Sequence, residues 1–160
     1  RKLGVVTYRS SIEWDGRFGR VRLDSEYKPK DRFGLEFEVE SYLEAHAERF
    51  VDQFDPNCYL YLSRSMDWFD FCQHCSKQST DIVEALSSLQ LQSALVLGAT
   101  TDILFPLHQQ QQIADGLNRG GTRVQFIPLD SHQGHDAFLV DIDKFAPPIR
   151  NFLAQLKQPL

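Results

Sequence analysis

The chain has 160 residues, of which 42% are hydrophobic and 24% charged, and its formal net charge is −5 at pH 7. This length and composition are ordinary for one globular domain that buries a substantial core. The acidic and basic residues are interspersed, which excludes the basic surface typical of nucleic-acid binding, and no apolar run reaches the length of a membrane span. We therefore expect no nucleic-acid partner and no membrane partner.

The first residue is Arg1 rather than Met, and the opening residues are typical of the middle of a helix, so we expect a truncated or processed chain. The 3 cysteines are an odd number, which disfavours a disulfide scaffold and favours a reducing compartment. We expect the cytoplasm, with the mitochondrion as the alternative, because a targeting segment would lie upstream. Cys72-Gln-His-Cys75 has the spacing of half a zinc site or of a redox motif, but no second Cys/His pair completes a zinc site, so we predict no metal.

The first thirty or so residues carry weak structural signals. Residues 1–8 mix apolar and basic side chains and are predicted to complete a helix. Glycine and aromatic residues over 9–20 predict an ordered loop, and the charged stretch over 21–30 predicts an exposed connection.

Two aromatic-rich helices are predicted in the middle of the chain. Apolar side chains recur at helical spacing over residues 37–54, and Asp55-Pro56-Asn57 ends this helix. Asp55 or Asn57 can cap a second helix over residues 58–69. The pair carries more aromatic surface than two amphipathic helices usually need. Ordinary core packing explains part of it, and a lid or dimer surface inserted into an α/β sheet is the functional interpretation.

The carboxyl-terminal half alternates between helical and strand-like patterns. Short apolar runs at 94–97 and 124–127 predict two buried strands. The helical spacing over 107–117 predicts a helix between them, ending near Asn118 and Gly120. This order is typical of a parallel α/β unit.

Two further helices flank that unit. The first is predicted over residues 79–88, with Thr80 or Asp81 as its cap. The last is predicted over residues 143–156, where its two prolines fit only in the early turns. Its inward face is predicted to consist of Phe145, Ile149, Phe152, Leu153 and Leu156.

An acid and a histidine follow the two predicted strands. Asp102 comes after the first strand and His135 after the second. Because ligands of parallel α/β sheets lie outside the carboxyl ends of the strands, these two side chains can meet there. A carboxylate that holds one imidazole nitrogen fixes the tautomer and stabilises the imidazolium that forms during proton transfer. Taken singly, a helix-capping aspartate and a structural loop histidine are the commoner interpretations.

The order Ser…Asp…His is that of the α/β-hydrolase triad. Only its last two members are present, because no Gly-x-Ser-x-Gly elbow occurs in the 160 residues. Without a nucleophile no acyl-enzyme forms, so we expect this chain alone to be inactive.

Several blocks of the sequence resemble one enzyme family in the right order. They are Thr7-Tyr8-Arg9-Ser10, Arg17-Phe18-Gly19-Arg20, Phe37-x-Val39-Glu40-Ser41-Tyr42-Leu43, Phe54-Asp55-Pro56-Asn57-x-Tyr59-Leu60-Tyr61-Leu62-Ser63-Arg64-x-Met66-Asp67, Asp102-Ile103-Leu104-Phe105-Pro106 and Gly134-His135-Asp136-Ala137-Phe138-Leu139. Together they resemble the carboxyl-terminal half of the homoserine O-acetyltransferases, a family that includes serine and homoserine O-acyltransferases using acetyl-CoA or succinyl-CoA.

The resemblance implies the carboxyl-terminal part of an α/β-hydrolase fold with a helical lid insertion. Residues 1–26 would be the end of a core helix and its following loop, residues 27–79 the lid, and residues 80–160 the core. The nucleophile-bearing amino-terminal part would be absent. Family members commonly dimerise through the lid, so a homodimer is expected.

The resemblance also implies roles for single residues. Asp102 and His135 would be the acid and base of the triad. Arg1 and Asp136 would hold the carboxylate and the ammonium group of the amino-acid acceptor, and Tyr8 would line the same pocket. A zwitterionic acceptor does need one cation and one anion, and arginine grips carboxylates with two hydrogen bonds. For Asp136, an N-cap of the turn over 137–140 is the structural alternative.

The expected function is an acyl-CoA-dependent O-acyltransferase of homoserine or serine in methionine or cysteine biosynthesis. It would work by a ping-pong mechanism through a serine acyl-enzyme, with acyl-CoA as co-substrate and no bound cofactor. A plain α/β-hydrolase with water as acceptor and a non-catalytic interaction module are the alternatives. The donor and the acceptor stay open, because one methylene changes binding by only about 1–3 kcal/mol.

Overall fold

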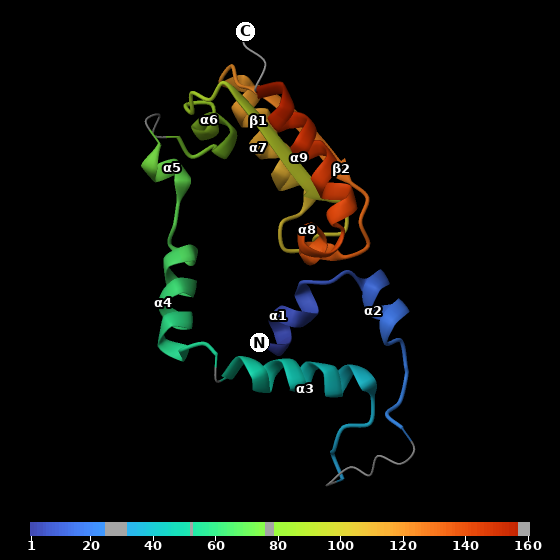
Figure 1. Ribbon diagram of the computed structural model, residues 1–160. Helices are drawn as coiled ribbons and strands as arrows, with labels where there is room; N and C mark the ends of the chain where they lie inside the picture. Colours follow the sequence, from blue (N-terminus) through green and yellow to red (C-terminus); the bar gives the residue numbers. More distant parts are fainter. Residues whose placement is uncertain (25–31, 52, 76–78, 157–160) are drawn as a thin grey trace.

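The computed structural model describes residues 1–24, 32–51, 53–75 and 79–156 (Figure 1). A two-stranded sheet, helices on its two sides and a set of amino-terminal helices below its end make up the described fold. The elements in chain order are α1 (Lys2–Thr7), α2 (Ser11–Arg17), α3 (Glu38–Val51), α4 (Pro56–Asp67), α5 (Phe71–His74), α6 (Ile82–Leu86), β1 (Ser93–Ala99), α7 (Leu107–Arg119), β2 (Arg123–Leu129), the 3₁₀ turn η1 (Gly134–Asp136), α8 (Ala137–Val140) and α9 (Ile142–Leu156).

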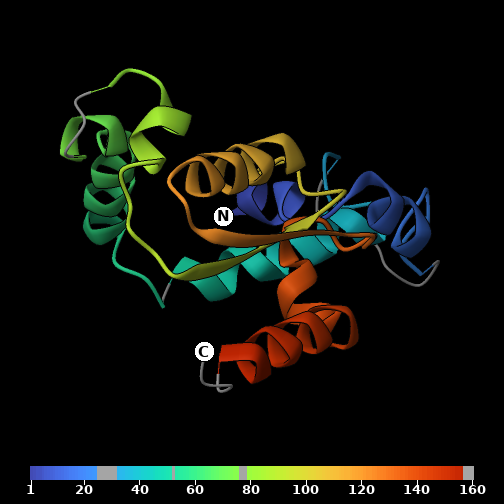
Figure 2. The ribbon, with the colours of Figure 1, turned by 90° about the horizontal axis from the view of Figure 1, so that it is seen from above.

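The predicted parallel unit is confirmed. Strands β1 and β2 pair in parallel over their full length, from Ser93 opposite Arg123 to Ala99 opposite Leu129. Helix α7 connects them, as parallel strands require. Seen from above, α7 lies on one side of the sheet and α9 on the other (Figure 2). Both strands therefore end at the same edge, where the loops bearing Asp102 and His135 begin.

The two strands differ in burial, and the prediction that both are buried is wrong for β2. In β1, Val96, Gly98 and Ala99 are buried. In β2 no residue is fully buried, and Val124 and Phe126 are only half-buried. The two strands are the whole sheet within the described residues, so β2 has only β1 beside it there.

Helices α6 and α7 pack closely against each other. Ala85 and Leu86 of α6 and Leu117 of α7 are buried. A Cβ atom at Gly116 would lie 2.6 Å from the Cβ of Leu86, so only glycine lets the two helices approach so closely. Asp81 caps α6 by accepting a hydrogen bond from the Val83 amide at 2.9 Å, which decides between the two predicted caps.

Helix α2 contradicts the loop that the sequence predicts over residues 9–20. Ser10 caps it, because the Ser10 hydroxyl accepts a hydrogen bond from the Glu13 amide at 3.1 Å. The Trp14 ring stacks on Phe18, with ring centroids 5.2 Å apart. The glycine content suggested a loop, but a serine cap and this aromatic pair stabilise a short helix around Gly16.

Helices α3 and α4 agree with the two predicted aromatic helices. Asp55 caps α4, accepting hydrogen bonds from the amides of Asn57 and Cys58 at 2.8 and 2.9 Å. Helix α3 packs against α1, whereas α4 stands away from the sheet in Figure 1. The predicted limits of the lid stay a prediction, and its first residues, 27–31, lie outside the described residues. The large side chains that α4 and its end expose are Tyr59, Leu60, Tyr61, Leu62, Met66, Trp68 and Phe69.

The inward face predicted for α9 is only partly correct. Phe145 and Phe152 are half-buried, but Ile149, Leu153 and Leu156 are 41%, 51% and 50% exposed. The helix contacts β1 and α8 and leaves the rest of its apolar side uncovered by described residues. The two prolines lie within the second turn of the helix.

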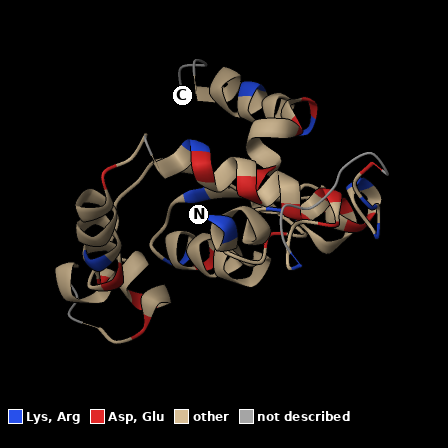
Figure 3. Cartoon of the chain, turned by 90° about the horizontal axis from the view of Figure 1, so that it is seen from below, with Lys and Arg blue, Asp and Glu red and all other residues tan. Residues whose placement is uncertain are grey.

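The charged residues are interspersed along the chain, as Figure 3 shows from below. None of the helices in the described ranges combines the length and apolar character needed to cross a bilayer. Cys58, Cys72 and Cys75 are free thiols. Within the same ranges, no group of three His, Cys, Asp or Glu side chains is arranged to hold a metal ion.

Candidate active site

The structure brings Asp102 and His135 together at the carboxyl ends of the two strands. Asp102 lies in the loop after β1, and His135 lies in η1 after β2. The Oδ2 atom of Asp102 is 3.0 Å from Nδ1 of His135. The sequence predicted this meeting from strand order alone, and the observed geometry is that of a carboxylate orienting an imidazole.

Asp102 both caps a turn and contacts His135. Its Oδ1 atom accepts hydrogen bonds from the amides of Leu104 and Phe105, each at 2.9 Å, so the residue does cap the turn before α7. Its Oδ2 atom is left for His135. The side chain is only 11% exposed. The carboxylate is therefore held in place by backbone donors and cannot turn away from the imidazole without breaking them.

The imidazole of His135 lies among aromatic rings. The ring centroid of Phe105 is 4.9 Å away, that of Tyr8 is 5.7 Å away and that of Phe138 is 6.2 Å away. Among the described residues no hydrogen bond reaches the second ring nitrogen, Nε2. A cavity of about 430 Å³ adjoins this ring, lined by Leu97, Gly98, Ala99, Asp102, Phe105, Gln110, His135, Ala137, Phe138 and Phe145. Nε2 is thus available to exchange a proton with a ligand.

Arg1 and Tyr8 form a chain of contacts that leads to His135. The guanidinium carbon of Arg1 lies 5.6 Å from the Tyr8 ring centroid and 5.1 Å from that of Phe50. Tyr8 in turn contacts the imidazole. Arg1 lines a separate cavity of about 200 Å³ on α3, together with His46 and Arg49. The structure therefore brings Tyr8 to the histidine directly and Arg1 only through Tyr8.

Asp136 is fixed by its backbone rather than by its carboxylate. Its amide donates a hydrogen bond to the Tyr8 carbonyl at 3.1 Å. It occupies the N-cap position of α8, but its side chain makes no capping hydrogen bond. The alternative of a structural N-cap therefore receives no support from hydrogen bonding.

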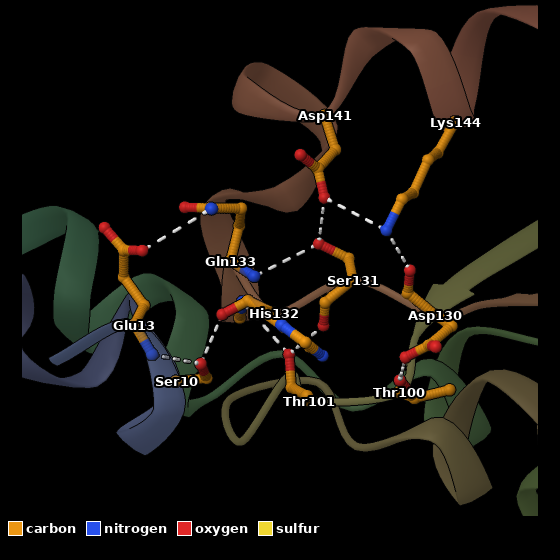
Figure 4. A network of polar contacts seen from close by, with 11 residues as sticks. Ser10, Glu13, Thr100, Thr101, Asp130, Ser131, His132, Gln133, Asp141 and Lys144 are labelled. Atoms are coloured by element: carbon orange, nitrogen blue, oxygen red, sulfur yellow. Dashed lines mark hydrogen bonds and ion pairs between the residues drawn. The ribbon is translucent and has the colours of Figure 1, made fainter. Parts of the chain in front are cut away.

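Sequence reasoning missed the polar network that holds the loop before His135 (Figure 4). Ser131 is fully buried, and its hydroxyl donates to Oδ2 of Asp141 at 2.5 Å. Thr101 donates to the Ser131 carbonyl, and Ser10 donates to the His132 carbonyl. The His132 side chain is exposed. The one available signal was Thr101, which directly precedes the predicted acid Asp102.

The groups whose pKa is shifted lie outside this pair, and two of them are His46 and Cys72. Burial and the nearby guanidinium groups of Arg49 and Arg1 lower the pKa of His46 on α3. Burial, reinforced by Asp70, raises the pKa of the Cys72 thiol. A thiol with a raised pKa is less often in its nucleophilic thiolate form, so Cys72 is poorly suited to the redox role that its spacing allowed.

Comparisons with known proteins address the family. No family model matches the chain. It is 63% identical over 156 residues to a serine O-succinyltransferase of Xylella fastidiosa (strain M12), which covers 98% of this chain and 41% of the relative. A serine O-succinyltransferase of Stenotrophomonas maltophilia (strain K279a) gives the same identity and coverage. The predicted resemblance to the homoserine and serine O-acyltransferase family is therefore confirmed. It spans about 41% of the length of these curated relatives.

Solved structures confirm the fold class predicted for this chain. A homoserine O-acetyltransferase from Bacillus anthracis matches 95% of the chain and 39% of its own chain, with a TM-score of 0.76 and 19% identity. The esterase E22 matches 95% of the chain with a TM-score of 0.72 and 20% identity. The predicted carboxyl-terminal part of an α/β-hydrolase fold is therefore confirmed.

Proposed function

We propose that this chain is part of an O-acyltransferase that moves an acyl group from acyl-CoA to the hydroxyl of serine or homoserine. The observation that carries the proposal is the 3.0 Å contact between Asp102 Oδ2 and His135 Nδ1 beside an open cavity. Strong sequence identity to proteins named serine O-succinyltransferase supplies the reaction class. Because no Gly-x-Ser-x-Gly elbow occurs here, the nucleophile is proposed to lie upstream, and these 160 residues alone are expected to be inactive.

The proposed reaction has two halves. In the first, His135 accepts the proton of the upstream serine as its oxygen attacks the thioester carbonyl, and CoA leaves as a thiol that takes this proton. In the second, His135 accepts the proton of the acceptor hydroxyl, whose oxygen attacks the acyl-enzyme, and the serine is released with its proton restored. Asp102 stabilises the imidazolium in both halves.

The proposed acceptor site uses two charges. Arg1 would bind the carboxylate of the amino acid, Asp136 would bind its ammonium group, and Tyr8 would line the space between them. The free Asp136 carboxylate beside His135 supports this assignment, since it makes no capping hydrogen bond. Holding the acceptor hydroxyl next to the base makes its attack effectively unimolecular. The names of the relatives favour succinyl-CoA and serine over acetyl-CoA and homoserine.

We also propose a homodimer through α4 and a cytoplasmic location. The exposed aromatic and aliphatic side chains of α4 support a partner surface, because contiguous apolar patches commonly mark interfaces. The three free cysteines support a reducing compartment. Product of such a transfer would serve cysteine or methionine biosynthesis.

The test is CoA thiol release by the chain extended with its upstream coding sequence. Succinyl-CoA and acetyl-CoA are each offered with serine, homoserine or no amino acid. His135→Ala is expected to lower the rate by about 10³-fold or more, because it removes the base. His132→Ala is the matched control, since its exposed ring belongs to the same loop and its backbone carbonyl is retained.

Release that needs an amino acid and is lost only in His135→Ala would support the transferase and identify both substrates. Release that ignores the acceptor would instead indicate a plain hydrolase. A folded full-length chain that releases no thiol would refute the transfer and leave an interaction role.

A further inference from the structure

One hydroxyl joins the loop of the acid to the loop of the base. Thr101 precedes Asp102, and its Oγ1 donates a hydrogen bond to the Ser131 carbonyl at 2.6 Å. The same oxygen accepts a hydrogen bond from the Gly134 amide at 3.1 Å. The hydroxyl of Thr101 therefore both donates and accepts across the two loops, and it does so through a single oxygen atom.

These bonds begin where the β-sheet ladder stops. The strand register ends at Ala99 opposite Leu129, and the Thr100 amide adds one more bond to the Leu129 carbonyl at 3.0 Å. Beyond this point the two loops are joined by side chains. The Thr100 hydroxyl makes a long contact of 3.5 Å with Asp130, Thr101 makes the first short connection, and the contact of Asp102 with His135 makes the next. In Figure 4, Thr101 points up from the loop after β1 toward Ser131 and His132.

The base loop is held on its far side by other groups. The buried Ser131 hydroxyl donates to Asp141 and accepts from the Gln133 amide at 3.1 Å. Gly134 has a φ of +65° and lies so close to the amino-terminal segment that a Cβ would be 2.7 Å from the Ser10 amide nitrogen. The loop thus has fixed supports behind it, and Thr101 is the side chain that ties it to the acid.

We propose that Thr101 is a positioning residue that keeps His135 Nδ1 within hydrogen-bond distance of Asp102. It acts by holding the Ser131 carbonyl and the Gly134 amide, which lie four residues and one residue before the histidine along the chain. The inference rests on the proposed function for its kinetic consequence, but the geometry it explains does not depend on which acyl group is transferred.

The experiment compares three variants in the full-length protein. Thr101→Val keeps the shape and removes the hydroxyl, Thr101→Ser keeps the hydroxyl, and Thr100→Val removes the neighbouring hydroxyl, which makes only a 3.5 Å contact with Asp130. The first readout is the downfield Nδ1–H proton resonance of a histidine bonded to a carboxylate, assigned by its loss in Asp102→Asn. It is recorded below the melting temperature of each variant, so a less stable chain is still measured folded.

Thr101→Val is expected to lose or shift this resonance, whereas Thr101→Ser and Thr100→Val retain it. In the acyl-transfer assay, Thr101→Val is expected to lower kcat roughly tenfold with KM unchanged, because the hydroxyl orients the base and does not touch substrate. Thr101→Ala, which leaves room for a water in place of the hydroxyl, repeats the test where valine disturbs folding.

A wild-type resonance and kcat in both Thr101→Val and Thr101→Ala would overturn the proposal. Equal losses in Thr101→Ser would also overturn it, because the methyl group and its packing would then be responsible. The two proposals can also fail separately. If the wild-type protein shows the resonance but transfers no acyl group, and the Thr101→Val variant lacks the resonance, the proposed function fails while the positioning role stands.

Discussion

The sheet region and helix α4 show two ways in which this chain uses apolar side chains. In the sheet region, α6, α7 and β1 bury residues such as Ala85, Val96 and Leu117. Helix α4 has no buried residue, although it is amphipathic and well capped by Asp55. The comparison shows that local helix signals do not by themselves bury a helix. Helix α4 has a capping residue and a helical pattern, but none of its residues is buried.

The candidate site belongs to the better-packed region. Its acid and base follow strands whose register is fixed over seven residue pairs, and hydroxyl side chains hold the loops beyond. The amino-terminal segment reaches this site through Tyr8 and through Ser10, which bonds to the carbonyl of His132. Residues that arrive from outside the sheet region thus meet the base loop through two side chains, the Tyr8 ring and the Ser10 hydroxyl, and through the backbone bond from the Asp136 amide to the Tyr8 carbonyl.

The largest expected effect comes from truncating one leucine in each region, which tests the contrast between the two regions directly. Leu117→Ala is expected to lower the free energy of unfolding by about 2–5 kcal/mol, because its side chain is 5% exposed and leaves a cavity against α6. Leu62→Ala, at 54% exposed, is expected to cost within about 0.5 kcal/mol at low protein concentration. Urea unfolding of the full-length chain measures both.

The same leucine on α4 tests the proposed dimer. Sedimentation of Leu62→Glu is expected to show dissociation at concentrations where the wild-type chain is dimeric, with secondary structure unchanged. Equal loss of unfolding free energy from Leu117→Ala and Leu62→Ala in a monomer would show instead that α4 is part of the core, and the contrast between the regions would be wrong.

A smaller effect separates two glycines with left-handed backbone. Gly121 has a φ of +90° and open space around it, whereas a Cβ at Gly134 would lie 2.8 Å from the backbone carbon of Arg9. Alanine at either position costs roughly 1–2 kcal/mol for the backbone conformation. Gly134→Ala is expected to cost a further 1–3 kcal/mol or so from the clash. Thermal unfolding compares the two, and equal costs would mean that the amino-terminal segment does not press on the base loop.

The sequence was sufficient for features set by local pattern and strand order. The two apolar runs became β1 and β2, and Asp102 and His135 met because parallel strands end at one edge. For α4 and α6 the sequence offered two candidate N-caps each, and the observed caps, Asp55 and Asp81, were among them. Such features depend on neighbours a few residues away or on a topological rule. A single sequence is therefore enough to predict them.

What the sequence did not predict depends on tertiary contacts. Helix α2 was missed because its serine cap and its Trp14–Phe18 stack outweigh the glycines that suggested a loop. The half-burial of β2 and the exposed side of α9 depend on which elements cover them. Thr101 was missed for a similar reason, since its two partners lie some thirty residues away and only the folded loops reveal them.

The smallest expected effect concerns pH and lies on α3, where the amino-terminal segment meets the middle helices. Burial and the charges of Arg49 and Arg1 lower the pKa of His46 in the folded chain below the ordinary histidine value of about 6.5. As the pH falls through that value, His46 binds a proton in the unfolded chain but remains neutral in the folded chain. Folding therefore becomes less favourable as the pH falls below about 6.5, until His46 titrates in the folded chain too.

His46→Gln is expected to remove this part of the pH dependence of the unfolding free energy. Arg49→Gln is expected to reduce it, because the guanidinium group with the largest effect on His46 is lost. The measurement is urea unfolding at several pH values between about 5 and 8, a range that spans the ordinary histidine value. Wild-type and His46→Gln chains with the same pH dependence would show that the cations around Arg1 do not act on His46. The guanidinium groups of Arg1 and Arg49 would then have no measurable effect on the imidazole of His46, although all three side chains line the same cavity.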